Sequence, residues 1–179
     1  MSWHSGVFLA ATGAVLLPGA TLVRAAAPDV PKEIAVPPGH KLLFQFEARG
    51  VQIYKAAAGT TGKLEWVLEA PLADLLDDQG RKAGCHYDNP PSWEAADGSK
   101  VVKSGDARSA AAPNPKTDIP WLLVKVKAQE GLEGIFSPVV YIQRLQTEGG
   151  KAPAESPKRV GTKVGVRYRA VYHCYGEAK

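Results

Sequence analysis

The sequence lacks the short motifs by which many enzymes are recognised. It contains no GxSxG nucleophile elbow, no HExxH or CxxC motif, no P-loop and no GxGxxG nicotinamide fingerprint. The nearest approach to a phosphate-binding loop, GTTGK at residues 59–63, is too short to cradle a phosphate. The sequence therefore gives no support to an NTPase or a dehydrogenase, and no motif in it requires a cofactor.

An excess of charge of one sign is also missing. The chain has 22 Lys and Arg against 18 Asp and Glu, a formal net charge of +4, and no run of five or more basic residues. Proteins that bind nucleic acids usually gather positive charge into a patch or a stripe. We therefore expect no nucleic-acid partner.

Cysteine is limited to Cys85 and Cys174, which both lie in strand-like stretches. In an oxidising compartment they predict one disulfide, and the alternative is two buried thiols that never meet. If the bond joined antiparallel neighbours, His86 would stand opposite His173 and form the best candidate metal or proton-handling site in the chain. Because a catalytic zinc usually has three protein ligands, Asp88 would have to complete that site.

The first 27 residues are typical of a secretory signal peptide. An apolar run at residues 7–15 is followed by a Pro-Gly break and then by three alanines at 25–27. An uncleaved anchor is the alternative, disfavoured because the segment has no clean run of the ~20 apolar residues that a spanning helix needs. We predict a secreted, periplasmic or extracellular protein with no membrane span after cleavage, in which residues 28–179 form one β domain.

Alternation of apolar and polar side chains dominates the rest of the chain. It is clearest in KVGVRYRAVYHCY at residues 163–175, and similar short segments recur between turns rich in Gly, Pro and Asp. No stretch forms a convincing amphipathic helix. About eight to ten short strands with this spacing predict an all-β protein, either an antiparallel sandwich or a barrel.

Several boundaries within this pattern can be proposed. Arg49-Gly50 is expected to join two short strands through a tight turn or a bulge, and residues 63–70 fit a strand or a helix that Pro71 closes. Residues 134–146 are expected to form a core strand. The segments 103–118 and 147–161 are poor in large apolar residues and are expected to be long loops.

The most distinctive stretch is QGRKAGCHYDNPPSWEAADGSKVVK at residues 79–103. Its ends are strand-like, and its Pro-rich middle carries Trp93 on an excursion of the kind that proteins often use for recognition. The alternative is structural: the prolines fix the backbone, Asp97-Gly98 makes a hairpin turn and Trp93 plugs a β core.

A series of motifs resembles the domain-of-unknown-function family 3455. The motifs, in order, are VPPGHKLLFQFEARGVQIYK, WVLEAPLADLLDDQGRKAGCHY, SWEAADGSKVV, IPWLLVKVKAQEG, YIQRLQTEGGKAP and VRYRAVYHCY. The resemblance covers residues 36–175 and implies an exported bacterial or fungal protein, without an established activity. It also implies a candidate site made of the motif residues His86, Tyr87, Trp93, Glu94, Asp97, Trp121, Gln143 and Arg144. The alternative for these residues is again structural, with Trp121 packed in the core and Arg144 bridging to Glu94.

The chain departs from the family pattern at two positions. Members of the family often carry one Cys after the QIY motif and another after GGxAP, where this chain has Lys55-Ala56 and Glu155-Ser156-Pro157. Both are missing together, and Cys85 and Cys174 stand where the family more usually has other residues. The resemblance therefore implies a relocated disulfide.

Three functional hypotheses follow. The first is a secreted β-sandwich module that binds a small molecule or a glycan against Trp93 and Tyr87. The second is an enzyme, a metal-assisted hydrolase or an oxidoreductase, that uses His86 with His173 or Asp88. The third is a structural extracellular or envelope protein. A pocket lined by these aromatic residues would favour the first hypothesis. Convergence of the histidines with a carboxylate would favour the second.

Overall fold

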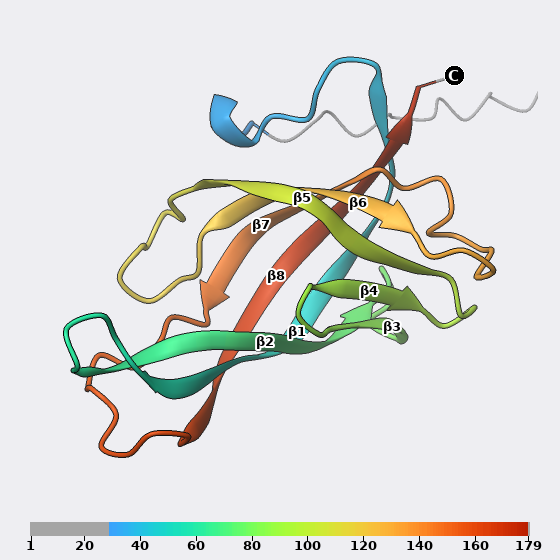
Figure 1. Cartoon of the computed structure of the whole chain (residues 1–179). Coiled ribbons are helices and arrows are strands. Elements are labelled where there is room, and N and C mark those ends of the chain that lie inside the picture. The colour runs from blue at the N-terminus through green and yellow to red at the C-terminus, as the bar shows by residue number, and fades with distance from the viewer. Residues whose placement is uncertain (1–28, 179) are drawn as a thin grey trace, which may run out of the picture.

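A computed structural model describes residues 29–178 and forms a closed antiparallel barrel of eight strands (Figure 1). The strands follow one another around the barrel in chain order, and the last closes on the first. They are β1 His40–Ala58, β2 Leu64–Leu76, β3 Lys82–Tyr87, β4 Ser92–Ala95, β5 Lys100–Ala110, β6 Trp121–Ala128, β7 Tyr141–Gly149 and β8 Lys163–Glu177. The all-β prediction is confirmed, and the architecture is the barrel. The segment predicted as a signal peptide lies outside the described residues.

The long strand β1 passes without a turn through the place where the sequence predicted one. A Cβ at Gly50 would lie 2.1 Å from the carbonyl oxygen of Leu72, so only glycine permits this approach of β1 to β2. Gly50 therefore brings two strands together instead of ending one of them. The prediction of two short strands joined at Arg49-Gly50 was wrong.

Proline and glycine misled the prediction at two further boundaries. Pro71 lies inside β2 opposite Gln52, close to the shift in the pairing with β1 at Glu69 and before the pairing with β3 begins at Ala73, and such a partly free strand position tolerates a proline. β5 likewise continues to Ala110 with a register shift after Lys103, so the loop predicted at 103–118 was wrong for residues 103–110. The β7–β8 connection occupies residues 150–162.

The connection between β6 and β7 closes one end of the barrel. Residues 134–140 do not form the first part of a strand, as the sequence predicted, since β7 begins only at Tyr141. Phe136 from this connection is fully buried, with its ring 5.7 Å from that of Phe44 and 5.9 Å from that of Phe46. Asp97 fixes the connection by accepting a hydrogen bond of 2.8 Å from the backbone N–H of Ile135.

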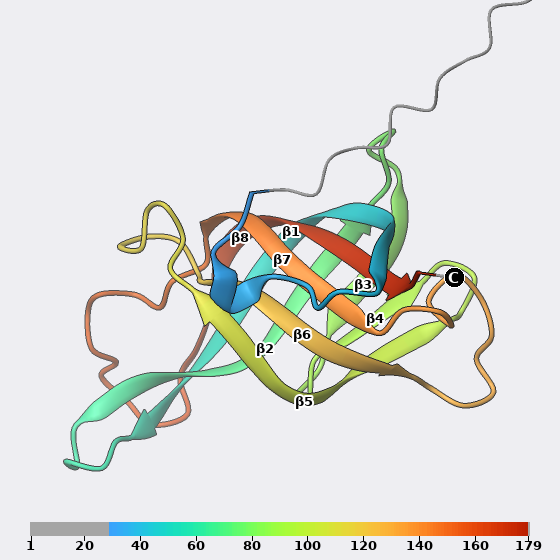
Figure 2. The ribbon, with the colours of Figure 1, turned by 90° about the horizontal axis from the view of Figure 1, so that it is seen from above.

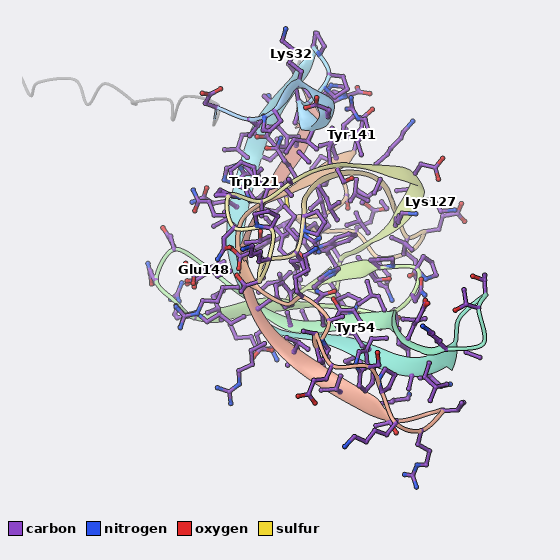
Figure 3. All side chains as sticks on the ribbon, turned by 90° about the vertical axis from the view of Figure 1, so that its left-hand side faces the viewer. Lys32, Tyr54, Trp121, Lys127, Tyr141 and Glu148 are labelled. Atoms are coloured by element: carbon purple, nitrogen blue, oxygen red, sulfur yellow. The ribbon has the colours of Figure 1, made fainter. Side chains whose placement is uncertain are left out.

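A second, smaller core lies outside the barrel wall. The 3₁₀ helix η1 (Lys32–Ile34) covers β6 and β7, where Ile34 packs on Leu123 and Leu145 (Figure 2). Trp121 and Tyr141 pack against the same cluster and lie below Lys32 in Figure 3. Between residues 29 and 178, no helix is long and apolar enough to cross a membrane.

Candidate functional site

Cys85 and Cys174 are free thiols, so the predicted disulfide is wrong. β3 pairs with β2 and β4, whereas β8 pairs with β7 and β1, and the two cysteine strands are therefore not neighbours. Cys174 also lies in the barrel core, while Cys85 lies on the outer face of the wall. The same separation excludes the relocated disulfide that the family resemblance implied.

Because no bond joins the two cysteines, a reducing agent is expected to leave the melting temperature within about 1 °C of its value without reductant. Cys174 is buried, and its burial raises the pKa of the thiol, so it should react with a thiol reagent only after unfolding. Thermal denaturation with and without dithiothreitol, together with thiol titration in guanidinium, checks this. A loss of several degrees on reduction would contradict the free thiols.

The predicted neighbourhood of His86 and His173 is also wrong. His86 stands opposite Ala73 and Trp93 and lies in the barrel interior. His173 stands opposite Gln45 and Gln143, on the other face of the wall from the core residue Tyr172. In the part of the chain that the structure describes, no group of three or more His, Cys, Asp or Glu is placed to hold a metal ion. The metal-site hypothesis thereby loses its geometric basis.

Tyr87 and Glu94 form a polar cluster on the outside of the barrel. The Tyr87 hydroxyl donates a hydrogen bond to the Glu94 carboxylate and accepts one of 2.9 Å from Nζ of Lys100. The bond to Glu94 is the main cause of a raised Tyr87 pKa. Since Trp93 is buried in the core, Tyr87 and Trp93 do not share a surface on which a glycan could stack.

Three further candidates hold the fold together. Asp97 accepts hydrogen bonds from the backbone and hydroxyl of Ser99, and these bonds help to keep the pKa of its carboxyl below the usual value. Nε2 of Gln143 donates a hydrogen bond of 2.8 Å to the carbonyl oxygen of Ile34 and so holds η1 against β7. Trp121 packs in the outer cluster. The Asp97 and Gln143 side chains therefore have structural roles, whereas the buried Nε1 of Trp121 has no acceptor among the described residues.

The remaining three candidates, His86, Trp93 and Arg144, come together on a cavity of about 140 Å³ inside the barrel. Arg144 does not bridge to Glu94, because its side chain points inward, and it donates hydrogen bonds of 3.2 and 2.9 Å to the carbonyl of Pro120. The other lining residues are Gln52, Leu68, Pro71, Pro91, Lys103, Ala107, Leu122, Val124, Ile142 and Tyr172.

Aromatic rings form one wall of the cavity. The His86 imidazole stacks on Trp93, with centroids 4.3 Å apart and planes 12° from parallel, and meets Tyr172 edge-on at 5.2 Å. Its Nδ1 lies 2.8 Å from the carbonyl oxygen of Ser92, the position of a donated hydrogen bond. Burial lowers the pKa of His86 to about 3, and the Arg144 charge acts in the same direction. The imidazole is therefore neutral at physiological pH.

Two polar groups in the wall have no partner. Nε2 of Gln52 and Nε1 of Trp93 are buried N–H donors without an acceptor among the described residues. Each side chain is only 2% exposed, and buried donors in folded proteins are nearly always paired. Sequence reasoning missed Gln52 and also Lys103. No pattern marked either residue, because a single polar residue in a strand does not show which face of the wall its side chain occupies.

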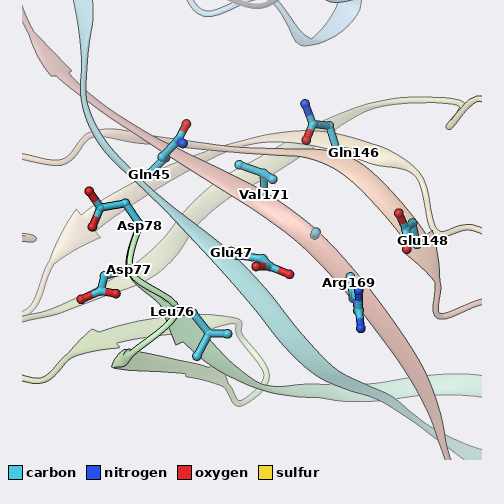
Figure 4. A pocket seen from close by; sticks show the side chains of 11 residues that line it. Gln45, Glu47, Leu76, Asp77, Asp78, Gln146, Glu148, Arg169 and Val171 are labelled. Atoms are coloured by element: carbon cyan, nitrogen blue, oxygen red, sulfur yellow. The ribbon is translucent and has the colours of Figure 1, made fainter. Parts of the chain in front are cut away.

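A larger groove of about 600 Å³ lies on the outer surface over β1 and β8 (Figure 4). It contains several carboxylates, of which Glu47 pairs with Arg49 at 2.8 Å and Asp77 with Arg81 at 2.8 Å. No aromatic ring lines the groove in the described part of the chain. With two of its carboxylates in ion pairs and no aromatic ring in its lining, it has fewer features of a ligand site than the internal cavity.

Comparison with known proteins places the barrel in a family. The chain matches the family described as "Protein of unknown function (DUF3455)" over residues 37–176. The chain belongs to this family. No curated protein and no solved structure matches it. The resemblance inferred from the order of the motifs is confirmed, and all residues that line the cavity fall within the DUF3455 region.

Proposed function

We propose that this DUF3455 barrel is a binding protein that holds one small, planar, mainly apolar ligand in its internal cavity. An eight-stranded barrel is just wide enough either to be filled by its own side chains or to keep one small ligand. Here the side chains leave a partly enclosed space beside a His-Trp stack, with two unpartnered donors in its wall. Those donors beside an open apolar space are the observation that carries the proposal.

The size of the cavity limits the ligand. A cavity of about 150 Å³ lined by apolar side chains is known to admit benzene, and this one has about 140 Å³. A single ring with a short substituent therefore matches the space, whereas an oligosaccharide exceeds it. This favours the small-molecule form of the binding hypothesis over the glycan form.

The cavity also has an access route. Leu68 is 49% exposed, and Ala107 is exposed as well, while Trp93, Val124 and Ile142, which also line the cavity, are buried. A ligand that enters past Leu68 and Ala107 would exchange its water shell for aliphatic and aromatic contacts. Burial of apolar area is the main source of affinity for such a site.

A ligand screen with a filled-cavity variant tests this proposal. Toluene, benzamide and benzoate are titrated against the protein while tryptophan fluorescence and melting temperature are followed. A ligand present at 100 times its Kd should stabilise the folded protein by about 2.7 kcal/mol. Val124→Phe places a ring in the cavity and should abolish the shift, while Val67→Phe makes the same exchange at a half-exposed valine that does not line the cavity.

Two results would contradict binding in the cavity. One is the absence of a shift with all three compounds. The other is a shift that persists unchanged in Val124→Phe. If Val124→Phe does not fold, Trp93→Phe replaces it, because the fluorescence change on binding must be reduced or lost in that variant when the ligand lies beside Trp93.

A further inference from the structure

We infer that the ligand of the internal cavity carries a carboxylate or a similar planar oxyanion, which Arg144 recognises with Gln52 and Trp93. This inference rests on the proposed function, since it assigns a chemical class to the ligand of the same cavity. It rests on the polar groups carried by the lining residues and on the charge of the lining.

The unpartnered groups are donors and not acceptors. Trp93 Nε1 has no acceptor in residues 29–178, and Gln52 Nε2 has none in hydrogen-bond geometry, although the Gln52 amide lies close enough to the Tyr168 hydroxyl to act on the pKa of that phenol. A donor left unpaired in a buried site costs its full desolvation penalty, so an acceptor supplied by a ligand is favoured. A toluene-like ligand without oxygen would leave both donors unpaired.

The charge of the lining has a single sign. Arg144 and Lys103 line the cavity, and no Asp or Glu does so in the described part of the chain. Arg144 is 9% exposed, takes part in no ion pair among the described residues, and donates only to the neutral carbonyl of Pro120. An unpaired buried charge is unfavourable, and an incoming anion would neutralise it.

The neighbouring titratable groups do not provide that negative charge. His86 is neutral, and burial raises the pKa of Tyr54 and of Tyr168, so both phenols stay protonated. The Tyr54 hydroxyl donates to the carbonyl of Gly150 at 2.7 Å. The guanidinium is always charged and presents a planar fork of N–H groups that matches a carboxylate.

Lys103 adds a second positive charge to the cavity and is expected to favour anionic ligands at its entrance. It is half-buried on β5, lines the cavity and is close in sequence to the exposed Ala107. A cation at an entrance raises the local concentration of anions and accelerates their association. We expect its contribution to be smaller than that of Arg144 and more sensitive to salt.

Calorimetric titration of benzoate and benzamide at pH 7 tests the inference, because the two compounds have nearly the same shape and differ in charge. Benzoate is expected to bind at least about tenfold more tightly than benzamide. Arg144→Met should remove this preference and leave the affinity for benzamide within about threefold. Lys125→Met removes the same charge from an exposed position on β6 and should change neither affinity.

Each outcome decides between the two claims. Equal binding of benzoate and benzamide would overturn the anion inference and leave the cavity-binding proposal standing, whereas no binding of either would overturn both. A preference for benzoate that survives in Arg144→Met would overturn the role of Arg144. If Arg144→Met does not fold, Arg144→Lys replaces it, because lysine keeps the positive charge and lacks the planar fork of N–H groups. Arg144→Lys should weaken the binding of benzoate and leave that of benzamide unchanged. Lys103→Met should have the same effect.

Discussion

Replacing Phe136 with alanine is expected to lower the free energy of unfolding by about 3–5 kcal/mol. Phe136 is fully buried and packs on Phe44 and Phe46, so truncation removes its ring and leaves a void that the surrounding strands cannot close. Residues in connections between strands usually contribute less to stability. Phe136 contributes more because the β6–β7 connection closes this end of the barrel.

Urea denaturation of Phe136→Ala beside Ile135→Ala measures the effect. Ile135 is the neighbouring residue and is 45% exposed, so its truncation should change stability by no more than about 0.5 kcal/mol. Similar losses of unfolding free energy in the two variants would contradict the role of Phe136 in closing the barrel end. The same would hold if neither variant lost stability.

Acidification from pH 6.5 to 4.5 is expected to lower the stability by about 2–3 kcal/mol through His86 alone. The pKa of His86 falls from 6.5 in the unfolded chain to about 3 in the folded protein, chiefly through burial. Between these values the unfolded state binds more protons than the folded state. The stability that depends on a neutral His86 is therefore fully present above pH 6.5 and is lost progressively as the pH falls toward 3.

The variant His86→Gln separates this effect from other acid titrations. Its stability should depend less steeply on pH between 6.5 and 4.5, even if its absolute stability is lower. His173→Gln should flatten the dependence less, because burial also lowers the pKa of His173 but the shift is smaller than that of His86. An unchanged slope in His86→Gln, measured by urea denaturation at a series of pH values, would contradict the buried neutral imidazole.

The alternation of side chains was enough to predict the fold class. Strands such as 163–175 show a period of two that no helix shares, and the order of the motifs identified the family. What the pattern did not reveal was which strands are neighbours. Cys85 and Cys174 were assumed to pair, but the barrel places β3 between β2 and β4.

The candidate site could not be predicted from the sequence because its residues occupy different faces of the barrel wall. His86 and Tyr87 are adjacent in sequence and lie on opposite faces of the wall, as do Trp93 and Glu94. Residues chosen for their place in motifs were therefore divided between the interior and the exterior. Gln52 and Lys103 were missed because an isolated polar residue in a strand does not reveal that its side chain points into a barrel.

Intermolecular nuclear Overhauser effects between a bound aromatic probe and the protein test the central claim most directly. With benzoate or benzamide present, we expect contacts from the probe ring to the methyl groups of Val124 and Ile142 and to the Trp93 indole, all of which line the cavity. Contacts restricted to the exposed methyl groups of Val67 and Val160, with none to the interior set, would contradict it.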